Sequence, residues 1–385
     1  MKDIAIIGAS YLQVPLIEKA REMGLTTHVF AWEAGEPGEK AADHFYPISI
    51  TEKEKILEEC RKIGISGITS ISSDLAAVTV NFVADALHLS GNSPECAYFS
   101  TNKHEMRMAF ERGGDPSVKS ILVKSPDDLK GISLTYPVIV KPLDRSGSRG
   151  ITKLCDEKGL YDAIERAKEE GFIKAALVEE FARGKEYSVE CISYGGMHQF
   201  LAMTEKFTTG SPNFVETAHL EPAEVSDEMH KKVKDTVFHA LDTLMITDSA
   251  SHSEIKIDDE GNIKMIEIGG RMGGDMIGSD LVYLSTGYDF LKAVIDVALS
   301  KEPSSFVPEK ENASAVRYIF GKEDLDALNC LLNEHPEYLV RKDIRAISGS
   351  KVSDSSKRFG YFLMKGPGRE ALLSYLPSGS IESEG

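Results

Sequence analysis

The sequence predicts an α/β domain with a parallel sheet, followed by units of α+β type. Over the first hundred residues, short β-rich runs alternate with amphipathic helical patterns, which is typical of a parallel sheet with helices on both faces. The breaker run Gly113-Gly114-Asp115-Pro116 then indicates a boundary nearby, and short strands with single helices follow it. Since 385 residues exceed one ordinary core, we expect up to three domains, at 1–100, 101–190 and 191–385.

Strands and helices are predicted to alternate along the first domain. Strands are predicted at 3–7, 27–32 and 67–71, and helices at 12–23, 52–63 and 75–87. The turn at Gly8 contains one glycine where a dinucleotide-binding fingerprint needs three, so no nicotinamide site is expected there. Loops 8–11 and 72–74 follow strands, and at the carboxyl edge of a parallel sheet they could contribute to a ligand pocket.

The later elements mix strands and helices without that regular alternation. A helix is predicted at 103–112, capped by Thr101 or Asn102, and a hairpin at 254–271. The other predicted strands are 120–124, 138–141, 176–180, 187–192, 200–206, 214–219 and 357–366, and the other helices are 157–170, 227–244 and one from about 289. A last region begins near Ala313. This mixture is the basis for the α+β assignment.

The composition excludes several classes of partner. A net charge of −17 and a pI near 5.1 argue against nucleic acid or an anionic membrane surface as the main partner. The five cysteines are scattered without a CxxC motif, as expected for buried thiols in a reducing compartment. No apolar stretch approaches the roughly 20 residues that span a bilayer, and the first apolar run is too short for a signal peptide. We therefore expect a soluble, cytoplasmic protein.

The hairpin at 254–271 is predicted to set two carboxylates against each other. With its turn centred on Glu260-Gly261, Glu254 and Glu267 become cross-strand partners. Four isoleucines then fall on the opposite face: Ile255, Ile257, Ile266 and Ile268. Because like charges directly opposite each other repel, such a pair suits a divalent cation with oxygen ligands, such as Mg²⁺. Two unrelated glutamates on a solvated face are the alternative.

A basic, glycine-containing loop follows the strand at 138–141. Lys141 ends this strand, just before Pro142. The loop behind it holds Arg145, Ser146, Gly147, Ser148, Arg149 and Gly150. A flexible loop rich in backbone N–H donors beside a lysine suits polyphosphate, although the GKS/T end of a Walker A loop is absent. A solvated basic surface loop is the alternative.

The segment LVEEFARGKEYSVE connects two strands through the run Glu179, Glu180, Phe181 and Ala182. Such a connection can present free backbone N–H and C=O groups to a purine edge. Glu186, a few residues later, can accept hydrogen bonds from both ribose hydroxyls. Together these features are typical of a nucleoside-binding strand connection.

In this order, the lysine, the glycine-containing loop, the EEF linker with its later glutamate and the paired hairpin glutamates resemble the ATP-grasp superfamily. The resemblance covers roughly residues 103–288. It implies a Rossmann-like parallel α/β domain at 1–100, followed by an ATP-grasp fold whose two α+β subdomains clasp ATP. Residues 101–190 would be the small, lid subdomain with its linker, and 191–385 the large subdomain with a C-terminal extension.

The resemblance implies roles for individual residues. The ATP-binding residues would be Lys103, Lys141, Arg145, Ser146, Gly147, Ser148, Glu179, Glu180, Phe181, Ala182 and Glu186. Glu254 and Glu267 match two acids that bind one or two Mg²⁺ ions, with Mn²⁺ as the alternative ion. Arg271 resembles the arginine that stabilises the transferred phosphoryl group, and with Lys141 it would be catalytic. Gly269 stands where many relatives carry a metal-binding asparagine, which leaves the number of ions open.

Within the superfamily, FVETAHLEPA and the downstream SHSEIKI resemble the carboxylate-amine ligase branch that includes bacterial L-amino-acid ligases. Its E-x-x-H pair corresponds to Glu216 and His219, a carboxylate for a substrate ammonium and an imidazole that can take a proton near neutral pH. Arg271, His252 and Asp275 are further substrate-pocket candidates.

The implied reaction is ATP-dependent joining of a small-molecule carboxylate and an amine through an acyl phosphate, with release of ADP and phosphate. The substrates would be amino-acid-like, and a homodimer is the default assembly. A purine-pathway or bicarbonate-activating ligase of the same fold is one alternative. A nucleotide-binding regulatory protein without turnover is another.

Overall fold

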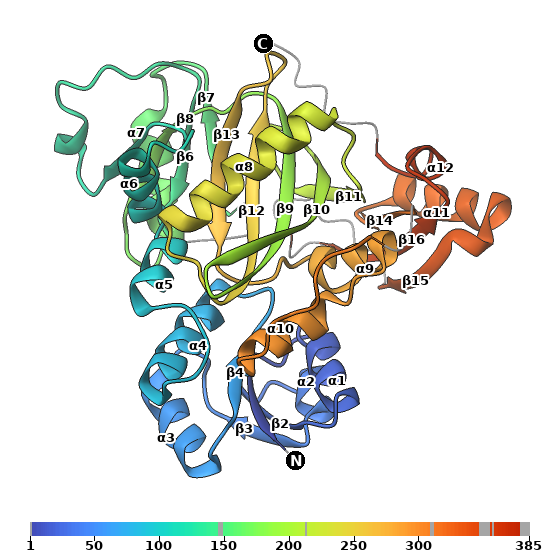
Figure 1. The fold of residues 1–385 in the computed structure, drawn as a ribbon. Helices are drawn as coiled ribbons and strands as arrows, with labels where there is room; N and C mark the ends of the chain where they lie inside the picture. Colours follow the sequence, from blue (N-terminus) through green and yellow to red (C-terminus); the bar gives the residue numbers. More distant parts are fainter. Residues whose placement is uncertain are drawn as a thin grey trace.

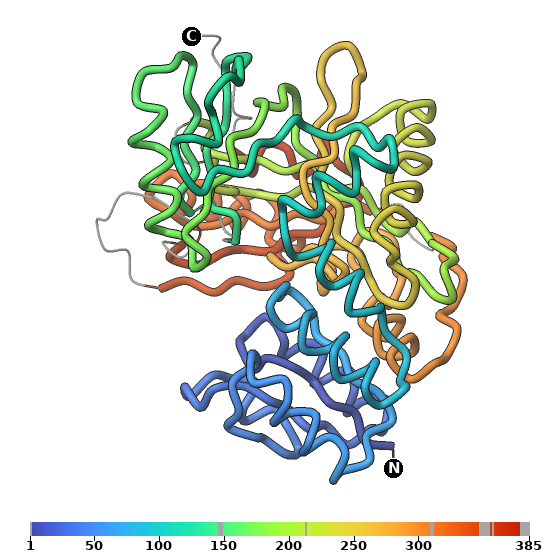
Figure 2. Tube along the Cα trace, turned by 90° about the vertical axis from the view of Figure 1, so that its left-hand side faces the viewer, coloured from blue at the N-terminus to red at the C-terminus, as the bar shows by residue number. Residues whose placement is uncertain are grey.

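The computed structural model of the protein describes residues 2–144, 149–211, 214–308, 312–345, 355 and 358–377. In these residues the strands form three sheets, of four, eight and four strands. Figure 1 shows the first sheet at one end of the molecule. In the view of Figure 2, the first hundred residues form a lobe set apart from the remainder of the chain. We call residues 2–101 the N-terminal lobe.

The sheet of the N-terminal lobe is parallel throughout, as predicted. Its order is β3-β2-β1-β4. Its elements are β1 (Asp3–Ile7), α1 (Val14–Glu22), β2 (Thr26–Ala31), α2 (Pro37–Ala41), β3 (His44–Pro47), α3 (Lys53–Ile63), β4 (Gly67–Thr69), α4 (Asp74–Leu87) and α5 (Pro94–Thr101). The sequence pattern does not predict α2 and β3, because β3 is a sheet-edge strand with no buried residue and therefore no apolar alternation.

The two faces of this sheet are covered by helices from different parts of the chain. Along β1, Ala5 and Ile7 point to one face and pack against α3 and α4. Ile4 and Ile6 point to the other face, where α1 packs together with α10 (Phe290–Ala298). The helix α10 thus returns to the N-terminal lobe almost two hundred residues after the chain has left it, as Figure 1 shows beside β4.

The second sheet is small and antiparallel. Its order is β5-β8-β6-β7, and α7 packs on one face. The helix α6 (Lys103–Gly113) leads into it. The elements that follow are β5 (Ser120–Val123), η1 (Pro126–Leu129), β6 (Val138–Pro142), β7 (Thr152–Leu154), α7 (Leu160–Glu170) and β8 (Ala176–Glu180). The N-cap of α6 is Asn102, whose side chain accepts hydrogen bonds from the amides of His104 and Glu105.

The third sheet is the largest layer and forms the floor of the cleft described below. Its order is β13-β12-β9-β10-β11-β14-β16-β15, with every pair antiparallel. Its strands are β9 (Lys185–Tyr194), β10 (Met197–Thr208), β11 (Glu216–Glu221), β12 (Ser249–Ile257), β13 (Ile263–Gly269), β14 (Ala313–Tyr318), β15 (Leu339–Ile344) and β16 (Gly360–Gly366). Its helical elements are α8 (Asp227–Thr243), η2 (Ile277–Leu281), α9 (Val282–Thr286), α11 (Lys322–Glu334), η3 (Pro336–Tyr338) and α12 (Glu370–Leu373). A core cluster joins α6 and α8 to β9, β12 and β13, and another joins α11 and α12 to β14 and β16.

The division predicted after residue 190 falls inside β9. This strand pairs with β10 and β12 from Lys185 onward and so belongs to the eight-stranded sheet along its whole length. We therefore propose that the small unit ends between Glu180 and Lys185, at the turn where Gly184 has a φ of +99°. A Cβ at this glycine would lie 2.0 Å from the carbonyl oxygen of Ile257, so the turn also requires a residue without a side chain.

The hairpin β12–β13 pairs Glu254 with Glu267, as predicted. One part of the prediction is wrong: Ile266 does not lie on the apolar face with the other isoleucines. A β-bulge shifts the register between Glu254 and Ile255, so Ile255 pairs with Met265. Met265 takes the buried position, and Ile266 lines the cleft beside the glutamates.

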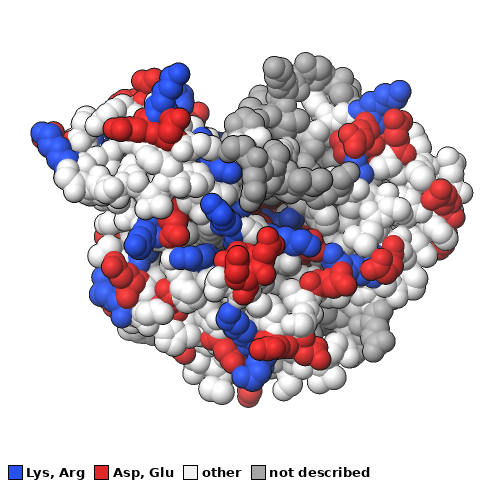
Figure 3. Space-filling view, turned by 90° about the horizontal axis from the view of Figure 1, so that it is seen from above, with Lys and Arg blue, Asp and Glu red and all other residues white. Residues whose placement is uncertain are grey.

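Charged side chains of both signs lie next to each other on the face shown in Figure 3, without a continuous basic surface over its described part. Among the helices of the described residues, none is both long and apolar enough to cross a bilayer.

Candidate active site

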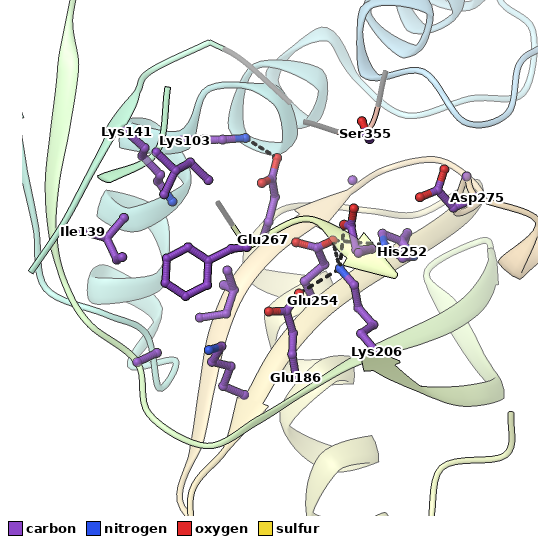
Figure 4. Close-up of a pocket in the computed structure, with 18 of the residues that line it drawn as sticks. Lys103, Ile139, Lys141, Glu186, Lys206, His252, Glu254, Glu267, Asp275 and Ser355 are labelled. Carbon is purple, nitrogen blue, oxygen red and sulfur yellow. Dashed lines mark hydrogen bonds and ion pairs between the residues drawn. The ribbon is translucent and has the colours of Figure 1, made fainter. Parts of the chain in front are cut away.

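A cavity of about 370 Å³ lies where the two antiparallel sheets and the N-terminal lobe meet. Side chains from all three sheet regions line it, among them Ser72, Asp74, Lys141, Glu179, Glu254 and Glu267. Figure 4 shows Lys103, Lys141 and Ile139 on one side of this space and Lys206, His252 and Asp275 on the other. We call these sides the nucleotide half and the substrate half, by the roles the sequence predicts for them.

Two buried lysines of the nucleotide half are each held by a carboxylate. Lys103 is the first residue of α6, and its Nζ lies 2.5 Å from Oε1 of Glu267. The Nζ of Lys141, at the end of β6, lies 2.6 Å from Oε2 of Glu179. Burial alone would lower the pKa of both ammonium groups; Glu267 reverses this for Lys103, whose pKa is raised, whereas the pKa of Lys141 stays lowered.

Arg107 is a functional residue that the sequence analysis missed. Its Nε donates to Oε1 of Glu179 at 2.9 Å, and its Nη2 donates to the carbonyl of Ile266 at 2.6 Å. Although burial raises the pKa of Glu179, Arg107 and Lys141 together lower it to about 2. Lys103 and Arg107 are four residues apart and share one face of α6, a spacing that could have drawn attention to both.

The resemblance implies a role for Glu179 in binding ATP. In the structure, its carboxylate contacts two buried cations. Both of its carboxylate oxygens already accept hydrogen bonds or ion pairs from Arg107 and Lys141. We therefore interpret Glu179 as the residue that holds Lys141 in place. The backbone N–H of Glu180 likewise donates to the carbonyl of Lys119, at 2.9 Å.

Part of the lining of this cavity is apolar. This part is formed by Val118, Ile139, Phe181, Ala182 and Ile266. The ring of Phe181 has the Nζ of Lys153 at 3.9 Å and that of Lys256 at 5.2 Å from its centroid. The predicted loop residues Arg145, Ser146, Gly147 and Ser148 lie outside the described residues.

Lys206 joins three of the predicted site carboxylates, and the sequence analysis missed it too. Its Nζ, on the buried strand β10, lies 2.6 Å from Glu254. The same atom lies 2.9 Å from Glu186 and 3.4 Å from Glu216. Burying an ammonium group requires such partners, and here they come from the predicted metal, ribose and substrate positions. A single lysine within an apolar strand offered no pattern by which to find it.

The two hairpin glutamates fit Mg²⁺ only when a bound ligand supplies further oxygen atoms. Among the described residues, no three His, Cys, Asp or Glu side chains are grouped to hold a metal ion by themselves. Mg²⁺ commonly takes one or two carboxylates and completes its shell with phosphate oxygens and water. Burial raises the pKa of Glu254, but Lys206 and His252 hold it well below its usual range, so this carboxylate is ionised and suited to the ion.

His252, a predicted substrate contact, lies between two carboxylates. Its Nδ1 is hydrogen-bonded to Glu190, and its Nε2 lies 3.5 Å from Oε1 of Glu254. Burial would lower the pKa of His252, but Glu190 and Glu254 raise it to about 9, so the ring is an imidazolium at neutral pH. Glu190 also accepts a hydrogen bond from the amide of Gly273 at 2.9 Å, which ties β9 to the loop after β13.

The substrate half brings together Glu216, His219 and Asp275 with two residues that the sequence analysis missed, Tyr318 and Arg358. Arg358 lies with its Nη1 2.8 Å from Asp275 and its Nη2 3.3 Å from Glu216. Its guanidinium carbon stands 3.6 Å from the centre of the Tyr318 ring. Arg358 comes from the segment before β16, whose sequence contains no signal for this site.

Several polar atoms of the substrate half are buried without a partner. Both ring nitrogens of His219 lack a hydrogen bond, and its nearest carboxylate oxygen, on Asp275, is 3.8 Å from Nε2. The Nε of Arg358 is also unpartnered. Burial lowers the pKa of His219, so the imidazole is neutral at pH 7. Unsatisfied buried groups beside a cavity are what a small-molecule ligand would satisfy.

Arg271 lies at the junction of the two halves. Its Nε is 2.7 Å from Oδ1 and its Nη2 3.0 Å from Oδ2 of Asp74, a residue of the N-terminal lobe. The predicted contribution of loop 72–74 to the pocket is thus present in the structure.

A model of the ATP-grasp domain matches residues 134–280, which run from just before β6 into η2 and include Asp275. This chain carries an ATP-grasp domain. The matched residues include Lys141, Glu186, Glu254, Glu267 and Arg271.

Curated proteins similar to this chain include a ligase and a synthase. Alanine–anticapsin ligase of Bacillus subtilis strain 168 is 25% identical over 312 residues, covering 74% of this chain and 61% of that protein. Carnosine synthase 1 of Mus musculus is 23% identical over 370 residues, covering 88% of this chain and 43% of that protein. The matched regions thus span less than two thirds of these relatives.

The solved structure of an L-amino acid ligase from Bacillus licheniformis superposes with a TM-score of 0.80 over 96% of this chain and 95% of that one, at 23% identity. Phosphoribosylglycinamide synthetase from Anaerococcus prevotii gives a TM-score of 0.75 over 96% and 95%, at 21% identity. These likenesses confirm the predicted fold class: a parallel α/β lobe followed by an ATP-grasp fold.

Proposed function

We propose that this ATP-grasp chain is an ATP-dependent carboxylate-amine ligase that joins amino-acid-like substrates through an acyl phosphate. The observation that carries the proposal is the continuity of one cavity. Its nucleotide half holds buried lysines and the two hairpin glutamates, and its substrate half holds acids, an arginine and a neutral histidine whose ring nitrogens have no hydrogen bond. An enzyme that transfers a phosphoryl group to one small molecule and then joins a second needs both halves in contact.

In the first step, an oxygen of the substrate carboxylate attacks the γ-phosphorus of ATP, and the bond to the bridging oxygen breaks to release ADP. Negative charge on the phosphate oxygens is balanced by the ammonium groups of Lys103 and Lys141. Arg271, at the junction of the halves, supports the acyl phosphate. Glu254 and Glu267 would hold Mg²⁺, which would supply further charge neutralisation on the phosphates.

In the second step, the amine attacks the acyl carbon and phosphate leaves, giving the amide. The amine enters as an ammonium ion, for which Glu216 and Asp275 are the nearest acids in the substrate half. It must lose a proton before it attacks. The neutral ring of His219, with both nitrogens unpartnered, is the group we propose as the acceptor of that proton.

The names of the relatives support amino-acid-like substrates for this chain. Those relatives are an alanine–anticapsin ligase, a carnosine synthase and D-alanine–D-alanine ligases. A D-alanine–D-alanine ligase of Flavobacterium johnsoniae is 26% identical over 294 residues, with 87% of that protein covered. Two of the similar solved structures are instead a phosphoribosylglycinamide synthetase and a biotin carboxylase domain, so the fold alone does not choose between the classes of ligase.

The test is a phosphate-release screen with MgATP and amino acids supplied singly and in pairs. We expect release to require one carboxylate and one amine, with an amide product found by mass spectrometry. Release that depends on bicarbonate or a purine-type amine would overturn the assignment in favour of the other ligase class. ATP binding without release across the panel would identify a regulatory protein instead. Light scattering would test the homodimer.

A further inference from the structure

The N-terminal lobe contributes one acidic side chain to the cleft for which the proposed reaction has no use: Asp74, the first residue of α4. Both of its oxygens face Arg271, at 2.7 Å from Nε and 3.0 Å from Nη2. The Nη2 contact is a hydrogen bond and the Nε contact is an ion pair by distance, so Asp74 holds the end of the Arg271 side chain in place. The two side chains are 28% and 15% exposed, so water screens the pair only in part.

The backbone around Asp74 is also joined to the segment that carries Arg271. Ile71 and Met272 form a parallel bridge, and the amide of Ser72 donates to the carbonyl of Met272 at 3.1 Å. Ser72 itself has a φ of +63°, a conformation that costs energy in a residue other than glycine. Because Ser72 keeps this strained conformation two residues before Asp74, we infer that the structure closely specifies the position of Asp74.

Gly269 gives an independent reason to regard the ion pair between Asp74 and Arg271 as a specified feature of the fold. A Cβ on this residue would lie 3.0 Å from Oδ1 of Asp74 and 3.1 Å from Cζ of Arg271, closer than side chains normally approach. A side chain at this position would therefore require Asp74 and Arg271 to shift by a few tenths of an ångström.

We propose that Asp74 is a positioning residue that holds Arg271 in the orientation required for acyl phosphate formation, and that Gly269 is small to admit the pair. The N-terminal lobe thereby becomes part of the active site. The anchoring of Arg271 stands on the contacts alone, whereas its kinetic consequence rests on the proposed ligase function.

The kinetic test is a double-mutant cycle. We expect D74A to lower kcat about 10- to 100-fold with the KM for ATP little changed, since a misplaced catalytic group costs up to about 10²-fold. If Asp74 acts only through Arg271, the double variant D74A/R271A will be no slower than R271A. D74E, which keeps the charge, should recover part of the rate. G269A should lower kcat in the wild-type background but not further in D74A.

The control is D43N. Asp43 pairs with Arg21 at 3.1 Å in the same lobe, outside the residues that line the cleft, so this variant should keep wild-type kcat. Additive losses from D74A and R271A, or wild-type kcat in both D74A and D74N, would overturn the positioning role.

A second readout does not depend on turnover. In D74A, hydrogen exchange should become faster at the Ser72 amide and in peptides spanning 269–274, while peptides from α3 stay unchanged. Unchanged exchange at Ser72 and 269–274 would show that the pair anchors nothing. If the wild type releases no phosphate with any substrate, the ligase proposal fails, and this exchange experiment still decides the anchoring.

Discussion

The nucleotide half and the substrate half of the cleft differ in how their charged groups are satisfied. In the nucleotide half, Lys103 and Lys141 each have a carboxylate within 2.6 Å. In the substrate half, both nitrogens of His219 and the Nε of Arg358 are buried without partners. Ion pairs hold cations of both halves, Lys206 and Arg358 of the substrate half included. The substrate half has in addition the ring of His219, whose missing hydrogen bonds a small molecule would complete, and an unsatisfied buried group costs about 1–3 kcal/mol.

Removing a cation or acid of the nucleotide half should have the largest effect. We expect Lys141→Ala and Glu267→Gln each to lower kcat/KM about 10³-fold, because charge on the transferred phosphoryl group is then poorly balanced. Phosphate release gives the rate, and circular dichroism checks the fold. Lys168→Ala, which removes a lysine of α7 paired to Glu165 near the surface, is the matched control. Near-wild-type turnover in either variant would refute the assignment of this half.

Breaking the buried ion pair between Arg107 and Glu179 should show how much this pair stabilises the nucleotide half. Arg107→Met leaves Glu179 with Lys141 alone and the carbonyl of Ile266 without its donor. We expect a loss of about 3 kcal/mol in the free energy of unfolding, measured by urea titration. The exposed pair of Lys62 with Glu58 is the control, since Lys62→Ala should leave the free energy of unfolding nearly unchanged. Equal losses would show that burial does not distinguish the two pairs.

In the substrate half, His219→Gln should lower kcat/KM about 10²-fold and change its pH profile. Because burial lowers the pKa of His219 below its ordinary 6.5, wild-type activity should persist below that pH and then fall as the ring gains a proton. This acid limb should be absent from the variant. His44→Gln, on exposed strand β3, should leave the profile unchanged. An acid limb retained in His219→Gln would assign the titration to another group.

The last expected effect is on stability alone and concerns Glu221, a buried carboxyl that belongs to neither half. It accepts hydrogen bonds from Thr204 and Ser285, and burial raises its pKa to about 8. Between its ordinary value of 4.5 and about 8, the folded protein holds a proton that the unfolded chain releases, so stability falls as pH rises. One proton corresponds to about 1.4 kcal/mol per pH unit.

Glu221→Gln should remove this slope, as measured by urea unfolding between about pH 5 and pH 8. Glu22→Gln, on the exposed face of α1, should keep the wild-type slope. Parallel curves for wild type and Glu221→Gln would mean that the folded protein does not protonate this carboxyl.

The sequence predicted those features that depend on local patterns. The first strand, the βαβα rhythm and the pairing of Glu254 with Glu267 follow from short periodicities and turn residues, and the structure confirms them. The bulge that moves Ile266 into the cleft was not predictable, because a register shift depends on how the strand packs against its neighbours.

The missed residues share one property: each acts through a partner far along the chain. Arg107 and Glu179 are 72 residues apart, Lys206 and Glu254 are 48 apart, and Asp74 meets Arg271 across 197. Such pairings exist only after the sheets have assembled, and no spacing rule in a single sequence encodes them.

The return of α10 to the N-terminal lobe has a consequence for the chain as a folding unit. A fragment that ended at residue 101 would lose the part of the cover over Ile4 and Ile6 that α10 supplies, and the remaining fragment would carry α10 with its lobe-facing side uncovered. Neither piece would be stable alone. We therefore expect a single cooperative melting transition in which lobe and cleft are lost together, and separately expressed pieces that regain solubility only when mixed.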